Sequence, residues 1–156
     1  MCPNWCSNKV LIKGKHDDMV KIKELLNEKD KEGNENVFSL GKIRPIPDEL
    51  KDTKAPPDKP NPTLRKKYGF DNWYDWCISK WGTKWNTTDA ILAKETPRSL
   101  HYYFDTAWSP PTGALVALST QFPNVRIVID VREEGMAFGG SMGIENGEID
   151  DNIRSL

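Results

Sequence analysis

The sequence contains little that would tie the protein to a membrane or to an oxidising compartment. It has no run of about 18 apolar residues, so no membrane span is expected. MCPNWCSNKVLIKGK, at the N-terminus, lacks the charged region followed by a long apolar stretch that is typical of a secretory signal. Three cysteines cannot all pair within one chain, which favours a reducing compartment. These absences predict a cytoplasmic protein with no membrane partner.

An excess of positive charge is also absent. The chain has 22 Lys and Arg against 23 Asp and Glu, a formal net charge of -1. Proteins that coat nucleic acid in general carry many basic residues to neutralise phosphates, so that function is not expected. The strongest local exception is LRKKYGF at residues 64–70, and such a run is usually a solvated loop.

Residues for metal binding or catalysis are equally sparse. Cys2 and Cys6 are close in sequence, but no His pair follows at zinc-finger spacing. Cys77 and His101 are a conceivable nucleophile pair, although nothing in the sequence brings them together. GGSMG at 139–143 lacks the Lys-Ser/Thr ending of a phosphate-binding loop. We therefore predict a non-enzymatic protein with no metal and no cofactor.

The apolar periodicity predicts short strands alternating with helices. Val10–Ile12 lie in a buried strand, a helix capped by Asp17 follows, and Ser109-Pro110-Pro111 begins another helix. The order β-α-β-α-β-β-α-β-β predicts an α+β sandwich, with helices on one face of a mainly antiparallel sheet. The other expected elements are a strand from 37 to 40, a helix over 71–81 stopped by Gly82, and strands at 90–93, 98–107, 125–131 and 136–140.

Proline is abundant in one place only. Residues 45–62 hold six of the eleven prolines, and proline removes backbone donors, so no regular element is expected there. The single domain, 1–156, is therefore expected to carry a Pro-rich surface insertion over 45–70. The acidic tail, 147–156, is expected to fray.

Tryptophan is concentrated in WYDWCISKWGTKW, residues 73–85, which holds four of the six. Helical spacing places Trp73, Trp76 and Cys77 on one face and Tyr74 and Trp81 on another. One face suits packing on the sheet. The second aromatic face is either further core or a surface that binds a flat ligand.

The end of this segment and DTAWSPP, residues 105–111, form the predicted site. An indole beside a lysine and a carboxamide suits a base with its phosphate, and Ser109 precedes a helix N-terminus that would attract an anion. Alternatively, Asp105 and Ser109 only cap a turn while Trp108 covers the core. We expect Trp85 and Trp108 to converge on one shallow pocket. The candidate ligand-binding residues are Trp81, Lys84, Trp85, Asn86, Asp105, Trp108 and Ser109.

Several motifs together resemble the YubB-like proteins of plasmids and phages. They are PNWCSN (3–8), IRPIP (43–47), WYDWCISKWGTKWN (73–86), FDTAWSPP (104–111) and EGMAFGG (134–140). The resemblance spans nearly the whole chain, and its Trp-rich and DTAWSPP motifs are specific. It implies a ferredoxin-like fold, an origin in a mobile element and, for a phage-encoded protein, the host cytoplasm. No established activity or catalytic residue comes with it.

Three functions stay open on this basis. The first is a binding module for a small, flat, anionic ligand such as a nucleotide or a nucleotide-derived signal, sequestered as counter-defence. The second is protein–protein interaction, with exposed tryptophans as anchors for a host protein or for a second copy in a homo-oligomer. The third is single-stranded nucleic-acid binding through LRKKYGF and the Trp loop.

Overall fold

A seven-stranded antiparallel sheet forms the centre of the protein, for which a computed structural model describes residues 4–133, 138–151 and 154–155. The strand order is β4-β5-β1-β6-β7-β8, and β9 also pairs with β7. The strands are β1 (Trp5–Lys13), β4 (Thr88–Thr96), β5 (Ser99–Ala107), β6 (Arg126–Glu133), β7 (Phe138–Glu145), β8 (Glu148–Asp151) and β9 (Arg154–Ser155).

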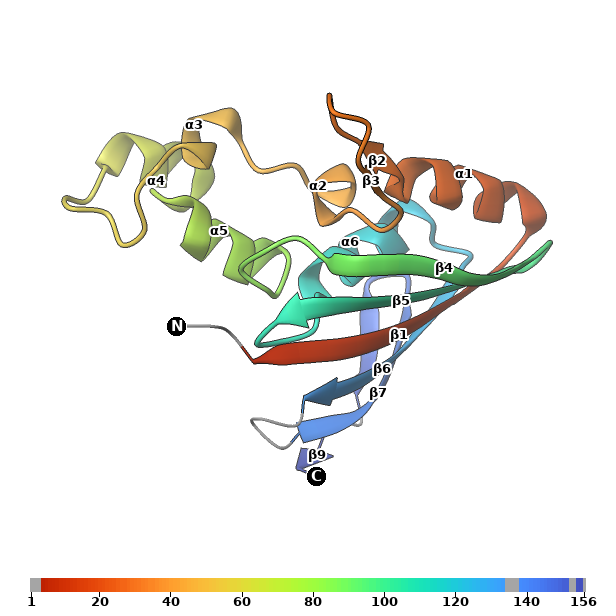
Figure 1. Ribbon diagram of the computed structural model, residues 1–156. Coiled ribbons are helices and arrows are strands. Elements are labelled where there is room, and N and C mark those ends of the chain that lie inside the picture. The colour runs from red at the N-terminus through yellow and green to blue at the C-terminus, as the bar shows by residue number, and fades with distance from the viewer. Residues whose placement is uncertain (1–3, 134–137, 152–153, 156) are drawn as a thin grey trace.

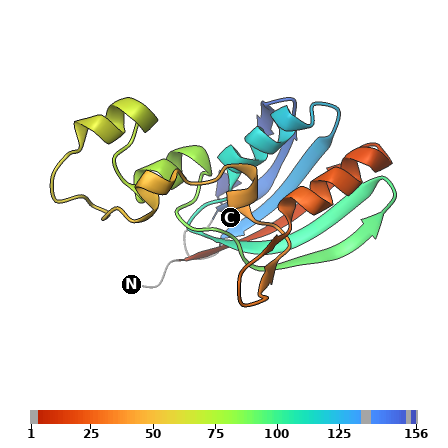
Figure 2. The same ribbon diagram turned by 90° about the horizontal axis from the view of Figure 1, so that it is seen from above.

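Two helices lie side by side over one face of this sheet: α1 (His16–Leu26) and α6 (Thr112–Gln121) (Figures 1 and 2). The path β1-α1-β4-β5-α6-β6, with β1 and β5 in the middle, is the ferredoxin-like arrangement of two split βαβ units. The predicted α+β sandwich, with its helices on one face of a mainly antiparallel sheet, is confirmed.

The alternation of side chains in β1 shows how the sheet divides into two faces. Cys6, Asn8, Val10 and Ile12 are buried under the helices, and the residues between them are mostly exposed. Cross-strand partners in an antiparallel pair share a face, so the exposed side continues into β5 through pairs such as Lys9 with Tyr103. We call this second side the open face.

A long insertion, residues 27–87, separates α1 from β4. Its last three helices extend beyond the end of the sheet (Figure 1). It contains the hairpin strands β2 (Glu28–Lys29) and β3 (Glu35–Asn36), followed by α2 (Leu40–Ile43), α3 (Asp48–Lys51), α4 (Pro62–Tyr68) and α5 (Trp73–Lys80). The predicted Pro-rich insertion, 45–70, is the middle part of this longer segment.

Two predictions for the insertion are wrong. Residues 37–40 are not a strand of the main sheet: Phe38 lies in a bend and Leu40 begins α2, and both are buried. A short apolar run does not distinguish a strand from a buried turn or helix. The Pro-rich segment does contain regular structure, since α3 lies between Pro47 and Pro56, where no proline interrupts the chain.

Other boundaries differ by a few residues. The first helix begins at His16, so Asp17 lies in its first turn, where it favours the helix dipole, rather than at the cap. In the tail expected to fray, Glu148–Asp151 pair with β7 as strand β8. Of the strand expected over 136–140, residues 138–140 lie in β7; Met136 and Ala137, like Cys2, lie outside the described residues.

Candidate functional site

The front of the Trp-rich segment is an α-helix that packs into the core. The Asn72 side chain accepts a hydrogen bond from the Asp75 N–H and caps α5. Trp76 and Cys77 are buried, and the ring of Trp76 meets that of Trp81 edge-on, with centroids 5.8 Å apart. This half of the segment stabilises the fold.

Trp81 is therefore a core residue and not the stacking surface predicted for it. It is 3% exposed, and its indole N–H donates to the Arg44 carbonyl at 2.8 Å. That bond satisfies the polar atom of the ring and ties α5 to the chain after α2. Helical spacing alone could not assign Trp81, because its burial depends on Arg44, 37 residues earlier in the chain, and on the start of α6.

Asn86 is likewise occupied inside the protein. Its Oδ1 accepts from the Leu40 N–H and the Thr87 N–H, both at 2.8 Å, while its Nδ2 donates to the Ser39 hydroxyl at 3.0 Å. The amide thus holds the start of α2 against the loop before β4. These bonds use both ends of the amide, so the prediction that Asn86 reads a base or ribose is not supported.

The loop between Trp81 and Thr88 is fixed against the end of β5. Gly82 adopts φ +91°, a conformation that favours glycine, and its carbonyl accepts from the Ser109 hydroxyl. The Thr83 hydroxyl donates to the Ala107 carbonyl at 2.8 Å. Because Trp5 pairs with Ala107 across β1 and β5, these contacts bring the loop to the beginning of β1.

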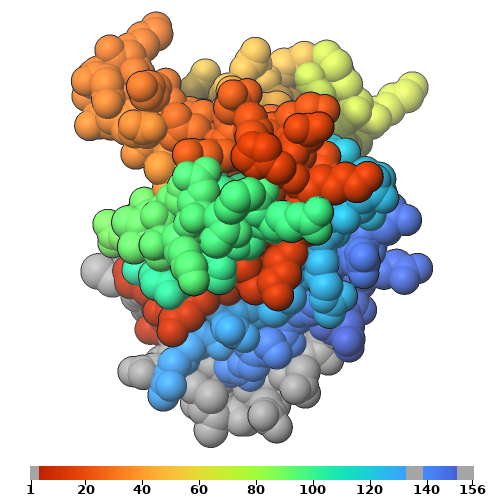
Figure 3. Space-filling model, turned by 90° about the vertical axis from the view of Figure 1, so that its right-hand side faces the viewer, coloured from red at the N-terminus to blue at the C-terminus, as the bar shows by residue number. Residues whose placement is uncertain are grey.

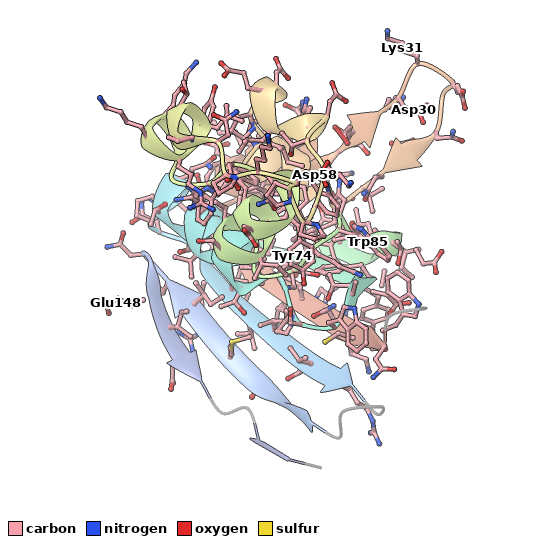
Figure 4. All side chains as sticks on the ribbon, turned by 90° about the vertical axis from the view of Figure 1, so that its left-hand side faces the viewer. Asp30, Lys31, Asp58, Tyr74, Trp85 and Glu148 are labelled. Carbon is pink, nitrogen blue, oxygen red and sulfur yellow. The ribbon has the colours of Figure 1, made fainter. Side chains whose placement is uncertain are left out.

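Trp85 lies on this loop beside the start of β4 (Figure 4) and contacts Trp5. The two ring centroids are 6.2 Å apart with 41° between the planes, and the side chains are 42% (Trp5) and 39% (Trp85) exposed. The Lys84 ammonium lies 4.1 Å from the Trp85 centroid. We call Trp5, Lys84 and Trp85 the Trp5–Trp85 surface; it combines two accessible indoles with one cation.

The predicted convergence of Trp85 and Trp108 is replaced by this pairing. Both residues are described, and the ring contact of Trp85 is with Trp5, with none to Trp108. Trp108 adopts φ +71°, and its backbone N–H donates to the Asn4 carbonyl at 2.8 Å. It therefore lies directly after β5, the strand that pairs with β1, and next to the Trp5–Trp85 surface.

The start of α6 does not provide the expected anion site. The helix begins at Thr112, and the Ser109 side chain bonds to Gly82 instead of capping it. The Ala114 N–H donates to the Trp81 carbonyl at 3.2 Å, and a Cβ on Gly113 would lie 2.5 Å from the Lys80 carbonyl oxygen. The end of α5 therefore covers the helix N-terminus that an anion would need.

The Asp105 side chain lies on the open face, directly across from Ser7 of β1. Partial burial raises the pKa of the Asp105 carboxyl, the nearby Asp89 carboxylate raises it further, and the Ser7 hydroxyl lowers it. Two carboxylates at this position would repel an anion placed over them. A bound phosphate is therefore better placed on the Lys84 side of the Trp5–Trp85 surface.

The open face continues the aromatic and cationic character along the sheet. The Lys9 ammonium lies 5.7 Å from the centroid of Tyr103, which is 43% exposed, and Ile91 beside Tyr103 is 53% exposed. Trp5 and Lys9 are four residues apart in β1, so their side chains project from the same face of the sheet. The Trp5–Trp85 surface, Lys9 and Tyr103, with Ile91 beside them, form one continuous strip on the open face, which we call the strip.

The basic run LRKKYGF lies elsewhere. Most of it lies in α4 at the far end of the insertion, away from the sheet (Figure 2), and two of its three cations are paired. Arg65 bonds to the Asp71 carboxylate at 2.9 Å, and Lys67 pairs with Glu49. This arrangement stabilises the insertion and does not contribute to the strip.

The residues considered for catalysis are separated. Cys77 is buried, and burial raises the pKa of its thiol to about 12, so it stays protonated at neutral pH. His101 lies in β5 on the open face, beside its cross-strand partner Leu11, whereas Cys77 lies in α5 within the core. No cluster of three or more His, Cys, Asp or Glu able to hold a metal occurs among the described residues, and none of the helices described there has the length and apolar character to cross a membrane.

Sequence reasoning missed Trp5. The signal was available: Trp5 is two and four residues before Ser7 and Lys9, so it shares their side of the first strand, away from Cys6 and Val10. Its contact with Trp85 was not predictable, because it depends on how an insertion of about 60 residues folds back to the sheet.

The topology gives the protein a ferredoxin-like fold, and the comparisons agree. Residues 80–155 match the model of a family described as the ferredoxin-like domain in Api92-like protein. The crystal structure of a protein api92 from Yersinia pseudotuberculosis is similar, with a TM-score of 0.64 and 11% sequence identity; the match covers 99% of this chain and 98% of that one. At this identity the likeness shows the fold alone. No curated protein has a matching sequence.

Proposed function

We propose that the protein is a non-enzymatic binding module that holds a small, flat, anionic ligand, of the nucleotide class, on the Trp5–Trp85 surface. The observation that carries this proposal is the pair of half-exposed indoles with the Lys84 ammonium 4.1 Å from one of them. Stacking of a base on an aromatic side chain contributes about 1–3 kcal/mol, and the ammonium pairs with the phosphate. A protein that only needed these rings for its core would bury them, as it buries Trp76 and Trp81.

The biological setting in this proposal is sequestration. A plasmid or phage protein that binds a nucleotide-derived signal of its host, without altering it, would act as a counter-defence factor in the host cytoplasm. The resemblance of the PNWCSN and DTAWSPP motifs to mobile-element proteins supports this setting. Trp5, which is part of the surface, and Trp108, which lies next to it, both belong to those motifs.

One observation favours a second candidate, single-stranded nucleic acid bound along the open face. The strip from Trp5 through Lys9 and Tyr103 lies on β1 and β5, the two middle strands of the ferredoxin-like unit. RNA-binding domains with a four-stranded sheet use aromatic residues on that surface to stack bases. A single-stranded oligonucleotide would cover the whole strip, whereas a mononucleotide would contact only the Trp5–Trp85 surface.

The test is a titration of the purified protein with ATP, GTP, NAD and a cyclic dinucleotide, followed by quenching of tryptophan fluorescence. We expect saturable quenching by a member of this panel, and an affinity at least about tenfold lower for Trp85→Ala and for Trp5→Ala, which is the loss of one stacking contact. Lys84→Ala should weaken binding and reduce its dependence on salt.

Tyr74→Ala is the matched control, because Tyr74 is an aromatic residue of similar exposure, 41%, on α5. It should bind like the parent protein. Absence of quenching across the panel, or equal binding by Trp85→Ala and the parent, would refute the proposal. For the second candidate, a ten-nucleotide poly-dT should bind with steep salt dependence, and Tyr103→Ala should weaken the oligonucleotide while leaving a mononucleotide unaffected.

A further inference from the structure

A cavity lies on the side of the sheet opposite the open face, between α1, the β2–β3 hairpin and the edge strand β4. Figure 3 looks onto this side, where α1 lies above β4 and the hairpin rises beside it. The cavity has a volume of about 470 Å³. Its apolar wall is formed by Val20 of α1, Val37 and Leu92, and its floor includes Tyr102. It does not share a residue with the Trp5–Trp85 surface.

Two polar atoms at this cavity have no hydrogen-bond partner among the described residues: the Tyr102 hydroxyl and Asn27 Oδ1. Tyr102 is fully buried, and burial raises the pKa of its phenol, so the hydroxyl stays neutral. A buried polar group without a partner usually costs about 1–3 kcal/mol, so such groups are rare unless something else satisfies them. Both residues line the cavity, which makes a bound group the natural partner.

The size of the cavity argues against a single structural water as that partner. One water occupies about 30 Å³, whereas binding sites for small molecules are generally about 300–1,000 Å³. At about 470 Å³ the cavity is in the second range.

The charge around the cavity selects the kind of ligand. Three carboxylates, Glu24, Glu35 and Glu95, line it together with one cation, Lys23. Lys23 is paired with Glu95 at 3.0 Å, so its charge is already neutralised. Glu24 and Glu35 have no ion-pair partner in the described part of the chain. The cavity is therefore anionic and attracts a cation.

We propose that this cavity binds a small primary aliphatic amine. An alkylammonium group has three N–H donors and no acceptor, which suits Asn27 Oδ1 and the Tyr102 hydroxyl oxygen as acceptors, with a carboxylate of Glu24 or Glu35 balancing its charge. Its alkyl chain packs against Val20, Val37 and Leu92. Val20 is 43% exposed without a ligand and would lose that exposure on binding.

The experiment compares three probes with the same four-carbon skeleton: n-butylammonium, n-butanol and butyrate. Each is titrated into the full chain labelled with 15N, and the shifts of the backbone and Asn27 side-chain amides are followed. We expect n-butylammonium to bind at least about tenfold more tightly than n-butanol, which lacks the charge, and butyrate to show no binding. The perturbed signals should belong to α1, β3 and β4.

Variants separate the proposed contacts from the fold. Tyr102→Phe removes only the hydroxyl and should weaken n-butylammonium about tenfold or more, and Glu35→Gln, at an exposed position, should weaken it severalfold. Tyr103→Phe is the matched control: it removes a hydroxyl from the adjacent residue, which faces the opposite side of the sheet, and should bind like the parent. The proposal is overturned by equal shifts for all three probes, by equal affinity of Tyr102→Phe and the parent, or by a crystal structure in which one ordered water bridges Tyr102 and Asn27 and n-butylammonium does not displace it.

Discussion

Trp81 and Trp85 are four residues apart in sequence, yet they lie in opposite environments. Trp81 is buried at the junction of α5 and α6 with its N–H bonded, and Trp85 is exposed at the edge of the sheet against Trp5. The same contrast extends to the carboxylates near them: Asp71, before α5, accepts several hydrogen bonds, while Asp105 faces another carboxylate. The buried groups around α5 stabilise the fold. The groups on the open face contribute little to the free energy of unfolding.

The largest expected effect is on the buried groups around α5. Trp81→Ala should lower the free energy of unfolding by about 3–5 kcal/mol, because it removes a buried ring and leaves the Arg44 carbonyl unpaired. Urea unfolding followed by circular dichroism measures this loss. A loss below about 1 kcal/mol would mean that Trp81 is not part of the core.

Asp71→Asn should cause the second largest loss of folding stability. The Asp71 carboxylate accepts from the Asn61 N–H, from Asn72 and from Arg65, and these bonds lower its pKa. A lowered pKa stabilises the folded protein above the usual value of 3.8, and this contribution is lost as the pH falls through the folded pKa. Thermal unfolding should therefore show a lower Tm for the variant at pH 7, and the difference should shrink toward zero below pH 3.8. A constant difference across this range would contradict the role of the charge.

Asp105→Asn should have the opposite effect and stabilise the folded protein at pH 7. The pKa of Asp105 is raised, so the folded protein favours its protonated form, and the carboxylate reduces stability as the pH rises through the unfolded and then the folded pKa. The variant should gain less than about 1 kcal/mol at pH 7 and nothing below pH 3.8, by urea unfolding at both values. A loss of stability at pH 7 would show that Asp105 is held by a favourable contact.

Trp85→Ala should have the smallest effect on folding. Its side chain is 39% exposed and its contact is with another exposed ring, so we expect a change within about 1 kcal/mol in urea unfolding. The same variant should lose nucleotide binding in the titration proposed above. A large loss of stability without a loss of binding would assign Trp85 to the core.

The sequence by itself determined the framework. The two-residue alternation in β5, the Pro-Pro start before α6 and the stop at Gly82 are local signals, because each depends on backbone conformation or on the face a side chain takes. They were enough to predict an α+β sandwich with helices on one face of the sheet, and to assign Trp76 and Cys77, at the front of the Trp-rich segment, to the core.

Only the tertiary structure decided which of the candidate ligand-binding side chains are exposed and which are used in contacts inside the protein. Trp81 and Asn86 are taken up by contacts with Arg44 and with residues 39–40, which are about 40 residues away in the chain. Trp5 meets Trp85 across 80 positions, and the cavity around Tyr102 needs α1, the hairpin and β4 together. Exposure and unpaired hydrogen-bonding groups are properties of the packed chain, so no local pattern reports them.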